Sequence, residues 1–225
     1  MKSKLLFSAL ILVIVLAGCK KDNLKEPTST ISGQIVFNKQ PISVRSNGVQ
    51  IELWQHGFQL FSKIPVYIDQ DGTFSAKVFD GNYKLTLLRG NGPWADKTDT
   101  IDVAVNGSAV VDVSVDPYFV IGSETFQKSG TNINATLNLQ RVNTSKALEL
   151  VRIYVGQTNI TDQNNNAGTA QKAAAVITDL SQPVTLSVPI PASLAAKDYV
   201  FVRVGVKTVG VAELLYSKPQ MVMLK

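Results

Sequence analysis

The stretch IPVYIDQDGTFSAKVFDGNYKLTLL (residues 64–88) decides the fold class. It contains three short runs of alternating apolar and polar residues, and the turn sequences DQDG and FDG separate them. Because successive side chains of a β-strand point to opposite faces, each run predicts a strand with one buried face. An Asp-Gly pair between two such runs is typical of a hairpin turn, since glycine readily adopts positive φ. The stretch therefore predicts consecutive β-hairpins.

The same alternation continues on both sides of this stretch. Seven candidate strands occur at intervals of about ten residues, a spacing that predicts a β-sandwich. These are residues 31–37, 49–55, 64–68, 73–79, 83–88, 100–105 and 109–115. Asp116-Pro117 interrupts the pattern, and a second series follows at 119–126, 131–140, 148–155, 184–188, 199–206 and 211–216. We therefore expect an all-β protein of two tandem β-sandwiches, at residues 30–117 and 118–225.

The N-terminal segment predicts export. Lys2 and Lys4 precede a largely apolar run of thirteen residues, 5–17, and Gly18 and Cys19 follow. A membrane-spanning helix needs about 20 apolar residues, so residues 1–18 are typical of a signal peptide rather than an anchor. The sequence LAGC also resembles the bacterial lipobox, in which the cysteine is acylated and becomes the first residue after cleavage. We expect a lipid on Cys19 that anchors the protein to the membrane; a signal peptide followed by an unmodified thiol is the alternative.

Residues 19–29 predict a lipidated tether. They are mostly polar, contain Pro27 and show no periodicity, which is typical of a flexible linker. Cys19 is the only cysteine, so the protein has no disulfide. In enterobacteria, an aspartate directly after the acylated cysteine marks retention in the inner membrane. Here that position is Lys20, so we expect the protein in the outer membrane, at the cell surface rather than on the periplasmic face.

The charge of the chain excludes a nucleic-acid-binding surface. Two of its 22 basic residues lie in the signal peptide, so the remainder carries 20 basic and 17 acidic residues, a net charge of +3. The longest basic run is Lys20-Lys21, which lacks the electrostatic footprint that nucleic acid requires.

Several motifs resemble known families. Gly33 at the first strand, DQDGTF (69–74) and GNYKL (81–85) resemble the carboxypeptidase regulatory domain, which implies a transthyretin-like (prealbumin-like) first sandwich. We expect the second sandwich to be immunoglobulin- or fibronectin-III-like. Longer motifs resemble a Bacteroidota lipoprotein family of unknown function; they are ELWQHGF (52–58), FDGNYKLTL (79–87), GNGPW (90–94) and RVGVKTVGVAELLYS (203–217). This resemblance implies SusC/SusD-type outer-membrane glycan uptake proteins as partners, and no known activity.

The sequence indicates neither a catalytic site nor a cofactor or metal site. His56 is the only histidine, and no serine or cysteine nucleophile accompanies it in sequence. One histidine and one acylated cysteine cannot supply the ligands that zinc needs. DQDG (69–72) begins like a calcium loop, but its glycine is at the fourth rather than the sixth position, which favours a hairpin turn. We therefore expect a protein that is not an enzyme.

The two tryptophans are the candidate sugar contacts, because a flat apolar ring can stack on the C–H face of a pyranose. Alternation in residues 49–55 places Trp54 on the polar face of its strand. Trp94 lies in the Gly/Pro-rich loop 89–96. The neighbours of Trp94 that offer hydrogen bonds to sugar hydroxyls are Arg89, Asn91 and Asp96. The alternative is that both rings pack under their own loops or against the other domain.

The second domain has a row of aromatic and arginine side chains. If the valines of strand 199–206 face the core, the residues on the opposite face of this strand and of strand 148–155 are Arg152, Tyr154, Tyr199, Phe201 and Arg203. This composition suits a protein interface or a sugar platform. A contact between the two domains is the alternative.

Asp99-Thr100-Ile101 matches the Asp-Thr-aliphatic acceptor pattern of Bacteroidota O-glycosylation, which makes Thr100 a candidate modification site; a strand-opening threonine is the alternative. Together these features predict an outer-membrane lipoprotein, accessory to polysaccharide uptake, that binds glycan or scaffolds the transporter. The alternative function is a structural adhesion or assembly module of the cell surface with no glycan ligand.

Overall fold

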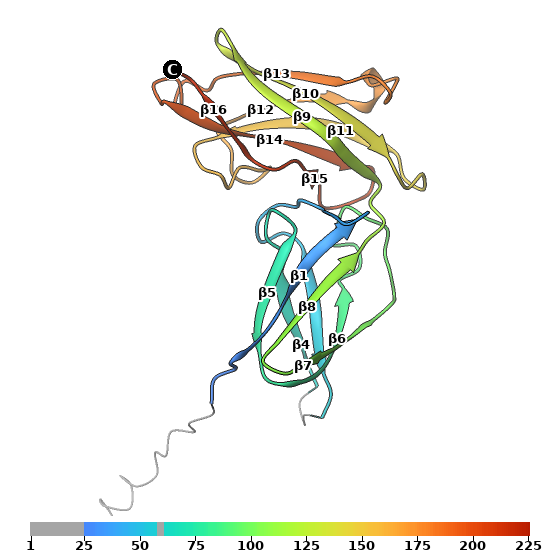
Figure 1. Ribbon diagram of the computed structural model, residues 1–225. Coiled ribbons are helices and arrows are strands. Elements are labelled where there is room, and N and C mark those ends of the chain that lie inside the picture. The colour runs from blue at the N-terminus through green and yellow to red at the C-terminus, as the bar shows by residue number, and fades with distance from the viewer. Residues whose placement is uncertain (1–24, 58–60) are drawn as a thin grey trace, which may run out of the picture.

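The chain forms two β-domains stacked end to end (Figure 1), as seen in a computed structural model that describes residues 25–57 and 61–225. The one helical element in this part of the chain is a short 3-10 turn, η1 (Ala174–Val176). The predicted all-β class is therefore confirmed. Across these described ranges, nothing helical has the length and apolar character needed to cross a membrane.

The first domain contains strands β1 to β8. Their bounds are β1 (Ser29–Phe37), β2 (Gln40–Pro41), β3 (Gln50–Gln55), β4 (Lys63–Tyr67), β5 (Thr73–Val78), β6 (Gly81–Leu87), β7 (Ile101–Val105) and β8 (Ser108–Ser114). One sheet is built around β1, which pairs with β2, β5 and β8, and the other has the order β4-β3-β6-β7. The core lies between the two sheets, and fully buried members include Ile31, Ile51 and Leu53.

The pairing of β1 with β8 is parallel, whereas the other strand pairs of this domain are antiparallel. It extends over seven residue pairs, from Thr30 opposite Ser108 to Val36 opposite Ser114. Gly33 allows the close approach of the two strands, because a Cβ at this position would lie 1.8 Å from the carbonyl oxygen of Val111.

Turns form at the predicted Asp-Gly and Asn-Gly pairs, but the predicted hairpins are wrong. β4 and β5, like β7 and β8, belong to different sheets, so each of these turns takes the chain from one sheet to the other. Gly72 and Gly107 have φ values of 89° and 77°, which L-amino acids other than glycine rarely adopt. These turns connect β4 to β5 and β7 to β8.

The second domain contains strands β9 to β16. Their bounds are β9 (Phe119–Ser129), β10 (Asn132–Arg141), β11 (Leu148–Gly156), β12 (Gly168–Ala173), β13 (Val184–Pro189), β14 (Tyr199–Thr208), β15 (Leu215–Tyr216) and β16 (Gln220–Met223). One sheet has the order β13-β10-β9, and the other runs β12-β11-β14, with β15 and β16 both paired to β14. Alternation correctly predicts the buried face of β14, on which Val200, Val202, Val204 and Val206 are buried.

Candidate functional site: the cleft between the two domains

Trp94 lies beside the linker that joins the domains. Its side chain is only 4% exposed, and it forms a β-bridge with Pro117 of the linker. The neighbouring Ala95 N–H donates to the carbonyl of Asp116 (2.9 Å), which fastens the loop to the linker. The predicted exposure of Trp94 to a sugar is therefore wrong. The ring packs against its own loop, since a Cβ on Gly92 would lie 2.1 Å from it.

The polar neighbours of Trp94 mostly serve their own loop. The Asn91 side chain accepts from Gln50 N–H (2.6 Å) and donates to the carbonyl of Gly48 (3.1 Å). Asp96 accepts a hydrogen bond from Gly90 N–H (2.7 Å). Arg89 is exposed. With Trp94 buried, these residues do not surround an aromatic platform.

Trp54 lies on the outer face of β3, as predicted, and is partly exposed. Its partners on the adjacent strands are Lys63 of β4 and Lys84 of β6. Phe61 lies beside it, with the ring centroids 5.2 Å apart. This is an open sheet face, and its contact with a sugar remains a prediction.

The predicted row of arginines and aromatics in the second domain divides into a buried and an exposed part. Tyr154 and Arg203 are fully buried and lie opposite each other on β11 and β14. Tyr199 is exposed, Phe201 is partly exposed, and their rings meet edge to face with centroids 5.8 Å apart. Arg152 is partly exposed and hydrogen-bonds Gln171 of the adjacent β12.

Arg203 crosses the boundary between the domains. Its Nε donates to the carbonyl of Ser217 (2.6 Å), and its Nη2 donates to the carbonyls of Val44 (2.7 Å) and Gln70 (3.0 Å) in the first domain. The guanidinium also lies over the Tyr216 ring, 4.4 Å from its centroid. Arg203 is therefore a contact between the domains, as the alternative prediction had it, and not part of an exposed protein interface or sugar platform.

The environment of Arg203 is poorly solvated. Burial lowers the pKa of Arg203 to about 10, although the nearby Tyr216 and Asp162 act in the opposite direction. The same burial raises the pKa values of Tyr154 and Tyr216. Because charged groups are costly to bury, this arginine depends on its carbonyl partners and on the aromatic ring.

A second arginine also connects the domains, and this one belongs to the first domain. Arg45 of the first domain makes a two-point ion pair with Glu213 of the second, at 2.6 and 2.7 Å. The hydrogen bonds to Glu213 raise the pKa of Arg45. Next to this pair, Tyr216 N–H donates to the carbonyl of Ser43 (3.0 Å) and continues the β-pairing across the boundary. The two domains therefore share a specific, largely polar interface.

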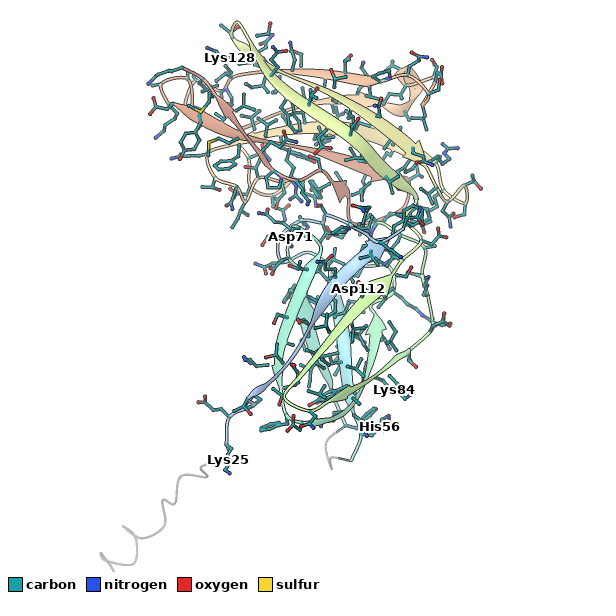
Figure 2. The ribbon with its side chains drawn as sticks, in the orientation of Figure 1. Lys25, His56, Asp71, Lys84, Asp112 and Lys128 are labelled. Atoms are coloured by element: carbon teal, nitrogen blue, oxygen red, sulfur yellow. The ribbon has the colours of Figure 1, made fainter. Side chains whose placement is uncertain are left out.

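A cleft of about 500 Å³ opens at this interface. Its walls include Asp69, Gln70 and Asp71 from the β4–β5 turn, and Asn159, Ile160 and Lys218 from the second domain. Figure 2 shows Asp71 at the end of the first domain that faces the second. Partial burial acts to raise the pKa of Asp71, but hydrogen bonds from Thr73 and the charge of Lys218 lower it overall, so its carboxylate is ionised at neutral pH.

The cleft offers the hydrogen-bonding groups that a hydroxyl-rich ligand needs. Carboxylates accept from hydroxyl groups, an ammonium group donates to them, and a side-chain amide does both. Ile160, which is largely exposed, adds an apolar surface. Within the part of the chain that the structure describes, no group of three or more His, Cys, Asp or Glu side chains is arranged to hold a metal ion.

The sequence contains the segments of this cleft but no sign that they meet. The DQDG turn predicts a hairpin, and Asn159 and Ile160 fall between a predicted strand and a polar loop, yet their association depends on the packing of two separate domains. Of the other predicted sites, Thr100 is exposed just before β7, and its glycosylation remains a prediction. Cys19 lies outside the described residues.

Two family models cover nearly all of the described chain. Residues 29–116 match the N-terminal domain of the protein family of unknown function DUF3823, and residues 119–221 match the domain of unknown function DUF3823_C. Among curated proteins, none matches the chain.

Solved structures agree with these matches. A DUF3823 family protein from Bacteroides ovatus ATCC 8483 is 35% identical, with a TM-score of 0.82 over 88% of this chain and 100% of that one. One from Parabacteroides merdae ATCC 43184 is 30% identical, with a TM-score of 0.80 over 89% and 100%. A candidate carbohydrate-binding protein from Bacteroides uniformis ATCC 8492 is 19% identical, with a TM-score of 0.71 over 88% and 100%, which establishes a shared fold alone. The resemblance to a two-domain family of unknown function is thus confirmed, and the chain belongs to the DUF3823 family.

Proposed function

We propose that this protein is a non-catalytic, glycan-binding lipoprotein that holds its ligand in the cleft between the two domains. It is anchored by a lipid on Cys19 in the outer membrane, faces the cell surface, and serves a SusC/SusD-type polysaccharide uptake system.

The lining of the cleft carries the proposal. Its volume of about 500 Å³ lies within the range of about 300–1,000 Å³ that is typical of small-molecule sites. Asp69 of the first domain and Asn159 of the second both line the cleft and offer polar groups from both domains. Lys218 adds a donor, and Ile160 offers an apolar contact for the C–H face of a sugar ring.

The comparison with solved structures supports the same class of ligand. The candidate carbohydrate-binding protein from Bacteroides uniformis shares this two-domain fold over its whole length. The likeness suggests a carbohydrate ligand and assigns no binding residue.

Affinity electrophoresis tests the proposal. A fragment of residues 25–225, which keeps both domains whole, is run through gels that contain plant and host polysaccharides. The cleft variant Asn159→Ala/Lys218→Ala and the outer-face variant Trp54→Ala are run beside it, with Lys225→Ala as a control for loss of an exposed charge at the chain end.

We expect one polysaccharide to retard the wild-type fragment and the Trp54→Ala and Lys225→Ala variants, but not the cleft variant. Loss of retardation in Trp54→Ala alone would move the glycan site to the outer face of β3. If nothing in a broad panel retards the wild type, the glycan proposal is wrong, and an adhesion or assembly module becomes the better explanation.

A further inference from the structure

An aromatic patch occupies the end of the first domain that lies farthest from the second. It consists of Trp54, His56, Phe61 and Phe79, which we call the aromatic tip. Phe61 and Phe79 are 49% and 48% exposed. The His56 ring stacks on Phe61, with centroids 4.6 Å apart. Exposed patches of this kind mark binding surfaces for proteins or membranes.

Hydrogen bonds and packing bring the segments of this tip together. The end of β3 adjoins the β5–β6 turn, because a Cβ on Gly81 would lie 2.6 Å from the side-chain nitrogen of Gln55. Phe79 lies in that turn, where its carbonyl accepts from the Tyr83 hydroxyl (2.9 Å). Trp54 and His56 both contact Phe61, and Phe79 lies at the same end of the domain, in the adjoining turn.

The N-terminal tether leaves the domain at the same end. Ser29, the first residue of β1, donates its hydroxyl proton to Asp80 in the β5–β6 turn (2.6 Å). Figure 2 shows Lys25 and His56 at this end of the molecule, on the side away from the second domain. The ten residues from Cys19 to Thr28 span at most about 36 Å, since an extended chain covers no more than about 3.6 Å per residue. A lipid on Cys19 therefore keeps the tip close to the bilayer.

From this arrangement we infer that the aromatic tip contacts the lipid bilayer directly and sets the orientation of the two domains on the membrane. Tryptophan favours the interface between lipid and water, where its apolar ring and its N–H group are both satisfied, and the exposed phenylalanines add apolar area that insertion removes from water. The inference rests on the proposed lipid at Cys19, which decides which end of the protein faces the membrane. It requires no glycan ligand and leaves the interdomain cleft free.

The charges around the tip indicate an apolar contact rather than attraction to anionic lipid. Lys63 is paired with Glu52, and Lys84 with Asp102, both at 2.6 Å. The basic side chains beside the aromatic rings are thus largely neutralised by acidic neighbours. We therefore expect binding to uncharged vesicles that changes little with salt.

Vesicle flotation of the unlipidated fragment, residues 25–225, tests this inference. The probe is a phosphatidylcholine vesicle, and the variants are Phe61→Ser/Phe79→Ser at the tip and Tyr199→Ser/Met223→Ser on the second domain. The second pair is a matched control, since Tyr199 and Met223 are 42% and 56% exposed but lie far from the tether. We expect the wild type and the control to co-float, and partitioning of the tip variant to fall by about tenfold, as expected for the loss of two inserted rings.

Tryptophan fluorescence provides a second measurement without changing either phenylalanine. Vesicles should shift the wild-type emission to shorter wavelength, and Trp54→Phe should abolish the shift, because Trp94 is buried in both states. The inference is overturned if the wild type does not co-float, if both double variants lose binding equally, or if only anionic vesicles bind. None of these results bears on the glycan electrophoresis, so the two proposals fail independently.

Discussion

The buried Arg203 predicts how firmly the two domains are coupled. Two of its three hydrogen bonds end on carbonyl oxygens of the first domain, those of Val44 and Gln70. Arg203→Met keeps an unbranched side chain in the same place but removes all three donors and the charge. We expect this variant to destabilise the protein and to uncouple the unfolding of its domains.

The magnitude follows from two opposing effects. Hydrogen bonds from a charged donor contribute about 1.5–3 kcal/mol each, so three of them contribute roughly 4.5–9 kcal/mol. Against this, burial lowers the pKa of Arg203 from 12.5 to about 10, which is roughly 3 kcal/mol of cost to the charged side chain. Methionine avoids that cost. We therefore expect the free energy of unfolding to fall by about 1.5–6 kcal/mol.

Denaturation with guanidinium chloride, monitored by two spectroscopic signals, measures both the loss of stability and the uncoupling of the two domains. Trp54 and Trp94, the only tryptophans, lie in the first domain, so fluorescence reports on that domain, while far-ultraviolet circular dichroism reports on both. The two curves should coincide in the wild type and separate in Arg203→Met.

Arg152→Met is the control, because Arg152 hydrogen-bonds only within the second domain, to Gln171; its effect should stay within about 0.5 kcal/mol. An Arg203→Met variant with an unchanged midpoint and coincident curves would refute the coupling role of Arg203.

Three further predictions concern the packing of the domains. Trp94→Ala removes a buried ring beside the linker and should cost about 3–5 kcal/mol in chemical denaturation, whereas a loss below about 1 kcal/mol would mean that the ring is not packed there. Gly33→Ala forces a methyl group against the backbone of Val111 and should lower the melting temperature more than an alanine at exposed Gly122, where a Cβ would meet nothing closer than 3.9 Å; equal melting temperatures would contradict the close approach of β1 and β8. Burial raises the pKa of Tyr154 and of Tyr216, so the stability that they contribute is fully present below the unfolded value of about 10 and is lost as the pH rises through their folded-state values. Phenolate absorbance should show these two groups ionising only as the protein unfolds in alkali, and their ionisation near pH 10 in the folded protein would contradict their burial.

Alternation predicts most of the strands because each central strand has one buried face. The strands that it does not predict are β12, β16 and the two-residue β2. In β12 the sequence GTAQKA has small and polar residues, and the strand forms because its backbone pairs with β11 at the edge of the sheet. In β16 four residues after Pro219 are too few to show a period. Edge strands depend on a neighbour more than on their own side chains.

The sequence correctly predicts on which face of a strand a side chain lies, but not which other segment of the chain covers that face. Alternation places Arg203 on the outer face of its strand, yet in the structure the first domain covers that face. Trp94 is in a loop that reads as exposed, yet the ring is buried against Gly92, and the backbone of the loop pairs with the linker. Both outcomes depend on contacts between segments far apart in the chain, and so does the cleft between Gln70 and Lys218.

The parallel alignment of β1 and β8 has a mechanical consequence. β1 starts at the tether, and β8 ends at the linker to the second domain (Figure 1). A force that pulls the second domain away from the tether therefore drags these strands past each other, so the bonds between seven residue pairs share the load and must rupture together. Antiparallel terminal strands would open one bond at a time. We expect the first domain to resist shear and to remain folded under a load applied between the tether and the second domain.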